Sequence, residues 1–72
     1  MTTKVELAML VDGEWQSVGV YPTLNEAFTG AKQNGPGEYG ADAEDNGNYG
    51  TEIIVHDDHS AEWRNGVDWH TV

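Results

Sequence analysis

The chain contains no cysteine, only three basic residues and no long apolar run. Without cysteine it has no disulfide, no thiolate ligand for zinc and no thiol nucleophile. Lys4, Lys32 and Arg64 are too few to hold the phosphates of a nucleic acid or an anionic lipid surface. No stretch approaches the ~18 apolar residues of a membrane span, and the first ten residues lack a signal-peptide pattern. We therefore expect a cytoplasmic protein that binds neither nucleic acid nor a membrane directly.

Acidic residues dominate the charge of the chain. Thirteen Asp and Glu residues face three Lys and Arg residues, which gives a formal net charge of −10. Like charges at this density repel one another and oppose compaction, most strongly at low salt. The natural partner of such a chain is a basic surface on another protein. The 72 residues are enough for one small domain, and the sequence leaves open whether it acts as a monomer or a dimer.

Residues 4–21 predict a β-hairpin closed by Asp12 and Gly13. This dipeptide lies between two apolar runs and suits the positive φ angles of a two-residue turn. The turn sets the register, and therefore decides which side chains share a face. One face is predicted to belong to the core: Val5, Leu7, Met9, Val18 and Val20. The opposite face is predicted to carry the remaining side chains: Glu6, Ala8, Leu10, Trp15, Ser17 and Tyr21.

Residues 24–34 predict the single helix. Apolar residues at i, i+3, i+4 and i+7 form the stripe that packs on the sheet: Leu24, Ala27, Phe28 and Ala31. Thr23 is the predicted N-cap, and Glu26 three residues later completes a capping box. Gly30 costs helix stability, which indicates a close contact with the sheet. Gly35, or the asparagine before it, can end the helix.

The C-terminal third predicts three short strands, near residues 51–56, 60–64 and 67–71. A polar turn over 57–60 separates the first two strands. A three-residue turn over 64–66 would place Trp63 and Trp69 together in the core under the helix. The complete pattern is ββαβββ. It predicts a single α+β domain over residues 1–72, with a mostly antiparallel sheet and one helix packed on one face.

The stretch over residues 35–50 is rich in glycine and acids, and it is predicted to be a long acidic loop. Four of its residues match positions 1, 3, 5 and 6 of an EF-hand calcium loop: Asp42, Glu44, Asn46 and Gly47. The twelfth position of such a loop is a bidentate glutamate, but Ile53 stands there in this chain. We therefore expect no intrinsic metal site and no cofactor.

The motif HDDH at His56–His59 gathers two imidazoles and two carboxylates within four residues. Neighbouring side chains on a strand point to opposite faces, so we interpret the motif as a polar turn and not as a metal site. Ser17 and Ser60 are the only serines, and no nucleophile elbow, phosphate loop or dinucleotide fingerprint occurs. We therefore expect a protein without enzymatic activity.

Three functions are compatible with this acidity. The first is an inhibitor that presents carboxylates to a basic, nucleic-acid-binding site on a partner protein, as a mimic of nucleic acid. The second is a small domain of a salt-loving organism in which acidity serves solubility. The third is a metal-responsive module built on residues 42–47.

The first function predicts two groups of partner-binding residues. Acids on the uncovered sheet face and in the glycine-rich stretch would supply the charge: Glu6, Glu38, Asp42, Glu44, Asp45, Glu62 and Asp68. Aromatic side chains would supply a desolvated anchor: Trp15, Tyr39 and Tyr49. Trp15 alternatively serves as a ring that covers the outer surface of the sheet.

In size, acidity and α+β pattern the chain resembles the small inhibitors that phages make against CRISPR effectors and restriction enzymes. This resemblance covers the whole chain and rests on no shared motif, so it transfers no residue role. It implies an anti-CRISPR or anti-restriction type of inhibitor that acts sterically, without a cofactor, in the cytoplasm of the host cell.

Overall fold

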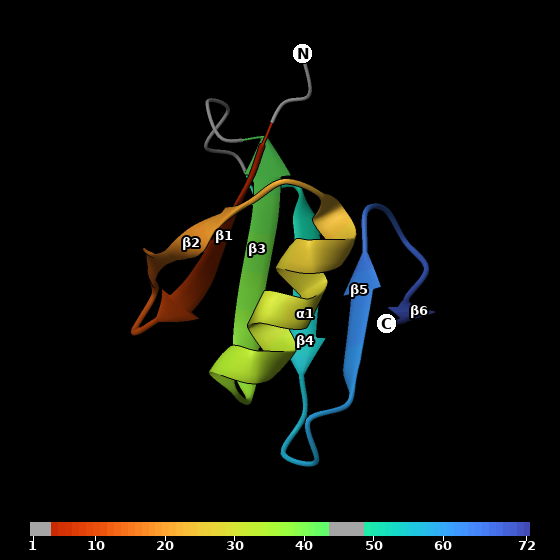
Figure 1. Ribbon diagram of the computed structural model, residues 1–72. Helices are drawn as coiled ribbons and strands as arrows, with labels where there is room; N and C mark the ends of the chain where they lie inside the picture. Colours follow the sequence, from red (N-terminus) through yellow and green to blue (C-terminus); the bar gives the residue numbers. More distant parts are fainter. Residues whose placement is uncertain (1–3, 44–48) are drawn as a thin grey trace.

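The computed structural model describes residues 4–43 and 49–72. The elements follow in the order β1 (Val5–Val11), β2 (Glu14–Tyr21), α1 (Leu24–Asn34), β3 (Gly37–Ala43), β4 (Thr51–Val55), β5 (Ala61–Arg64) and β6 (His70–Thr71). The strands form one antiparallel sheet in the spatial order β2-β1-β3-β4-β5-β6. Figure 1 shows α1 packed across one face of this sheet. The predicted α+β class is confirmed.

The connection from β2 through α1 to β3 passes over β1. Both β2 and β3 pair antiparallel to β1, so they run parallel to each other on either side of it. This is a split β-α-β arrangement, in which the crossover helix covers the sheet. The side under α1 holds the core. The opposite side, called the outer face below, has no helix over it within the described residues (Figure 1).

The β1–β2 hairpin confirms the predicted turn and corrects half of the predicted register. Asp12 and Gly13 have φ angles of 52° and 81°, as a two-residue turn requires. The register shifts between Leu7 and Ala8, because Val18 is an extra residue on β2. The side chains beyond this bulge therefore change faces. Val20 lies on the outer face, 43% exposed, and Tyr21 packs against the core, the reverse of the prediction.

The helix begins and ends as predicted. Thr23 Oγ1 accepts the backbone N–H of Glu26 at 3.2 Å, and the chain leaves the helix at Gly35 with φ 116°. Three residues of the predicted stripe, Ala27, Phe28 and Ala31, are buried in one core cluster with Leu7 of the sheet, and Leu24 packs against this cluster partly buried. A Cβ on Gly30 would overlap the Tyr21 hydroxyl, which explains the glycine. Among the described residues, no helix combines the length and the apolar composition that a membrane crossing needs.

The main correction concerns the glycine-rich stretch, part of which is β3 and not a loop. β3 pairs with β1 on one side and with β4 on the other, so it lies in the middle of the sheet. Its side chains alternate: Tyr39 and Ala41 are buried under α1, and Glu38 and Asp42 stand on the outer face. The alternation is weak in the sequence because the buried side chains include alanine and the outward ones include glycine. Residues 44–48 of the predicted loop lie outside the described residues.

The C-terminal strands confirm the predicted polar turn and correct the last hairpin. β4 and β5 pair antiparallel around residues 56–60. Trp63 pairs with His70, so the last connection spans residues 65–69 and is longer than the predicted three residues. Trp63 packs partly buried against the core and stacks on Phe28 with ring centroids 5.3 Å apart. Trp69 is outside the core, 37% exposed, and the Arg64 guanidinium lies 4.5 Å over its ring.

Candidate functional site

The outer face gathers carboxylates from four adjacent strands. Strand pairing places Glu6 of β1 directly opposite Asp42 of β3. The same alternation turns the acids of β3, β4 and β5 outward. Gly40 of β3 pairs with Glu52 of β4, and Ile54 of β4 pairs with Glu38 of β3 and with Glu62 of β5. Five acids therefore share one side of the sheet: Glu6, Glu38, Asp42, Glu52 and Glu62.

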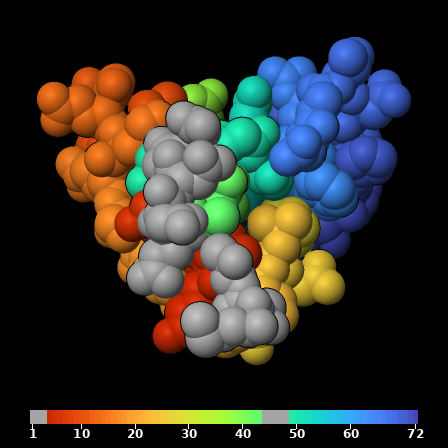
Figure 2. All heavy atoms as spheres, turned by 90° about the horizontal axis from the view of Figure 1, so that it is seen from above, coloured from red at the N-terminus to blue at the C-terminus, as the bar shows by residue number. Residues whose placement is uncertain are grey.

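Each end of this face is occupied by a part of the sheet that extends away from α1. Figure 2, seen from above, shows the β2 side in orange and the β5–β6 side in blue, with α1 in yellow at the opposite edge. The central strands lie between these two flanks. In the middle of the outer face, β1, β3 and β4 run side by side.

Most of the outer carboxylates already have partners of their own. Glu6 accepts hydrogen bonds from the hydroxyls of Tyr49 at 2.8 Å and Ser17 at 3.3 Å. Glu52 Oε2 accepts from Nε and Nη2 of Arg64 at 3.3 and 3.1 Å. Within residues 4–43 and 49–72, Glu38 has no hydrogen-bond or ion-pair partner, and its side chain is exposed. Glu38 is therefore an open acceptor on this face.

Two aromatic rings pack together over the middle of the outer face. Trp15 and Tyr49 have ring centroids 5.0 Å apart, and Trp15 stays 44% exposed. They lie over Gly40, where a Cβ would come within 2.7 Å of Tyr49 Cβ and 2.9 Å of Trp15 Cη2. Glycine at position 40 thus makes room for the pair, at the cost of a weaker strand.

Beside these rings lies a hollow of about 230 Å³. Its lining combines apolar and aromatic surface with two carboxylates: Leu10, Trp15, Glu38, Tyr49, Glu52 and Ile54. We call it the outer-face hollow. An exposed aromatic surface next to the open carboxylate of Glu38 is suited to bind a cationic or amphipathic group.

The Tyr49 hydroxyl is expected to ionise at higher pH than an ordinary tyrosine. Its hydrogen bond to Glu6 raises the pKa of Tyr49 from the ordinary value of 10.0, and partial burial and the charge of Glu6 add to the rise. Because the folded-state pKa is raised, the contact stabilises the fold below the ordinary pKa, and this contribution is lost as pH rises through the raised pKa. Ultraviolet titration of the wild type against Tyr49→Phe isolates this ionisation. Glu6→Gln should lower the pKa of Tyr49, and an unchanged pKa would contradict the contact.

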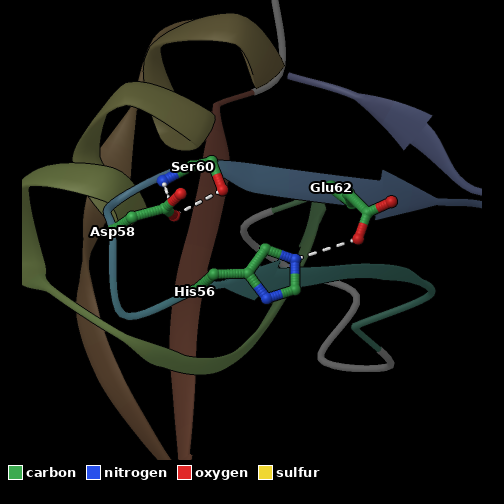
Figure 3. A network of polar contacts seen from close by, with 4 residues as sticks. All are labelled: His56, Asp58, Ser60 and Glu62. Carbon is green, nitrogen blue, oxygen red and sulfur yellow. Dashed lines mark hydrogen bonds and ion pairs between the residues drawn. The ribbon is translucent and has the colours of Figure 1, made fainter.

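The HDDH motif forms the predicted polar turn (Figure 3). His56 Nε2 lies 2.9 Å from Glu62 Oε2, whereas His59 Nδ1 lies 3.3 Å from the Lys32 carbonyl oxygen, so the two imidazoles serve different partners. Asp58 accepts the Ser60 hydroxyl at 2.6 Å and the Ser60 N–H at 3.0 Å, and these bonds lower the pKa of Asp58. The described residues hold no cluster of three or more His, Cys, Asp or Glu arranged for a metal ion.

The predicted partner-binding residues fall into four groups. Six lie on the outer face or pack over it: Glu6, Trp15, Glu38, Asp42, Tyr49 and Glu62. Tyr39 was predicted as a loop anchor, but it is a core residue of β3, 1% exposed. Asp68 lies away from the outer face, in a second hollow with Trp63 and His70. Glu44 and Asp45 lie outside the described residues.

Glu52 and Ile54 belong to the outer face, although neither was predicted there. The period-two pattern of β4 contains the signal, because Ile53 and Val55 are buried and the residues between them must point outward. Three adjacent apolar residues hid this alternation.

Comparison with known proteins supplies no relative. No protein-family model, curated protein or solved structure matches the chain. The outer face therefore carries the functional proposal by itself.

Proposed function

We propose that this protein is a non-enzymatic binding module whose outer face occupies a basic, nucleic-acid-binding site on a partner protein. The observation that carries the proposal is the uneven distribution of acids. The outer face presents five carboxylates and one arginine, whereas α1 on the other side carries one acid, Glu26, and one base, Lys32, and β2 adds Glu14 on that side. Acidity that serves solubility alone requires no such preference for one side.

The spacing of these acids suits a basic groove. Neighbouring strands lie ~4.8 Å apart, so carboxylates on adjacent strands form a grid of negative charge. Each strand of a nucleic acid duplex presents one phosphate per ~3.4 Å of axis, an interval of similar size. The basic side chains that hold phosphates can therefore meet carboxylates on this face.

The Arg64–Glu52 ion pair and the His56–Glu62 hydrogen bond on this face do not close it to a partner. Arg64–Glu52 and His56–Glu62 are both solvent-exposed, and exposed pairs contribute at most about 1 kcal/mol. A partner with several arginines or lysines can compete for both acceptors. The aromatic pair Trp15–Tyr49 would supply the desolvated contact, because aromatic residues dominate the binding energy of most interfaces.

An inhibitor made by a phage against a CRISPR effector or a restriction enzyme is one such module. In that setting the protein would act in the host cytoplasm and would block the effector sterically. The uncovered acidic face, the small size and the α+β fold support this finer form of the proposal.

Two matched triple variants test the proposal. The outer-face triple is Glu38→Gln, Glu52→Gln and Glu62→Gln, and the control triple is Glu14→Gln, Asp57→Asn and Asp68→Asn. Both triples remove three negative charges, but only the first set lies on the outer face. Immobilised wild type and both variants are used to capture partners from nuclease-treated lysate of the host cell, and the affinity of the captured partner is then measured.

We expect the captured partner to be a basic nucleic-acid-binding protein. The outer-face triple should weaken its affinity by about tenfold or more, whereas the control triple should change it by less than about threefold. Raising salt from 0.1 to 1 M should also weaken binding, since the Debye length falls from ~10 to ~3 Å. Equal losses from both triples would show that net charge alone acts, and no loss from either would refute the proposal.

A further inference from the structure

We infer that the outer-face hollow receives a single arginine side chain of the partner protein. This inference rests on the proposed function and names the contact through which a basic partner is anchored. The hollow lies where the acidic grid and the aromatic pair meet, between β2 and β4. Its apolar lining matches the methylene stem of an arginine side chain, and its aromatic and carboxylate linings match the guanidinium.

The apolar lining suits the stem of an arginine. Leu10 and Ile54 are both half-buried, so each presents part of its side chain to the hollow. Arginine buries its methylene stem on apolar surface while it keeps its charged head at a polar rim.

The aromatic lining suits the guanidinium. A guanidinium over an indole face is attracted by the ring quadrupole, and Trp15 is the more exposed ring of the pair. The Tyr49 ring packs against the Trp15 indole, and Gly40 leaves room for the indole because it has no side chain.

The two carboxylates at the rim supply acceptors for the guanidinium. Glu38 has no partner among the described residues. Glu52 uses Oε2 for both of its bonds to Arg64, which leaves Oε1 without a hydrogen bond from within residues 4–43 and 49–72. Covering these carboxylates with an apolar group would remove them from water without compensation, so a cationic occupant is favoured.

The same face already holds one arginine in this manner. The Arg64 guanidinium donates through Nε and Nη2 to Glu52 and lies 4.5 Å over the Trp69 ring. A carboxylate on one side and an indole on the other therefore hold a guanidinium on this surface. Lysine lacks the planar fork that makes both contacts together, so arginine is the expected occupant.

The inference is tested with the peptide Ac-Ala-Arg-Ala-NH2 and with two matched peptides that carry citrulline or lysine in place of arginine. Citrulline keeps the shape of arginine and removes the charge. Binding is followed by the NMR shift of the Trp15 indole N–H, which Trp15→Phe distinguishes from the other two indoles. We expect saturable binding of the arginine peptide in about the millimolar range, weaker binding of the lysine peptide and none of the citrulline peptide.

Glu38→Gln should weaken the arginine peptide about three- to fivefold. Glu14→Gln is the control, because it removes the same charge one residue from Trp15 but on the other face of β2. Both positions are exposed, so both variants should keep the wild-type spectrum. Equal effects of the two variants, equal binding of citrulline or lysine, or no saturable shift at Trp15 would each overturn the arginine site.

The outcome is separable from that of the proposed function. If the peptide does not bind but the outer-face triple still weakens capture of the partner, the arginine site is wrong and the acidic-face function stands. If the arginine peptide binds with the expected selectivity but both triples capture the partner equally, the arginine site stands and the proposed function fails.

Discussion

Replacing Phe28 with alanine is expected to lower the free energy of unfolding by about 3–5 kcal/mol. The Phe28 ring is buried under the sheet-facing side of α1, 5% exposed, and stacks on Trp63. Deleting it removes this stack and leaves a cavity among Leu7 and Ile53, which the surrounding backbone cannot fill. A loss of this size is comparable with the whole stability of a 72-residue domain, about 4–10 kcal/mol, so much of the variant should be unfolded at room temperature.

Urea and thermal unfolding followed by circular dichroism measure this loss. The matched control is Gln33→Ala on the exposed side of the same helix, which should shift stability by no more than about 0.5 kcal/mol. Unchanged melting of Phe28→Ala would contradict the packing of α1 on the sheet.

Tyr39→Ala is expected to destabilise the protein by a similar amount, about 3–5 kcal/mol. Tyr39 is among the largest fully buried side chains, and its hydroxyl donates to the Gly35 carbonyl oxygen at 2.6 Å and accepts from Asn34 Nδ2 at 3.0 Å. The side chain thus joins the centre of β3 to the end of α1. Its removal costs both a core ring and the bonds that hold the helix terminus.

Tyr39→Phe separates these two contributions. It keeps the ring and removes the hydroxyl, so the expected loss is about 1 kcal/mol. The measurement is chemical denaturation of both variants under the same salt conditions. Wild-type stability of Tyr39→Ala would mean that the side chain is exposed, as the sequence pattern had predicted, and that it remains available to a partner.

Local signals predicted the elements whose conformation is decided by neighbouring residues. The Asp12–Gly13 turn, the Thr23 cap and the polar turn at 57–60 all depend on contacts between residues at most a few positions apart. The apolar stripe of α1 likewise depends only on helical spacing. The position of Trp15 on the outer face followed from the turn, because the register next to a two-residue turn leaves no alternative.

The same local reasoning failed where distant strands decide the conformation. β3 has few residues of high strand propensity, and it is a strand because β1 and β4 pair with both of its edges. The bulge at Val18 exchanged the faces of Val20 and Tyr21, since one extra residue reverses the alternation. Trp69 lies outside the predicted core because Trp63 pairs with His70, which leaves Trp69 in the last connection and not in a strand.

By itself, the sequence determined the charge of −10, the absence of thiol chemistry, the helix and the tight turns, because each depends on composition or on residues close in the chain. Only the tertiary structure decided that the acids of four strands share one face. That outcome requires β3 to stand between β1 and β4, where pairing turns Glu38, Asp42 and Glu52 to the same side. Gly40 completes the arrangement, because a strand without a side chain at that point admits the rings of Trp15 and Tyr49 between the carboxylates.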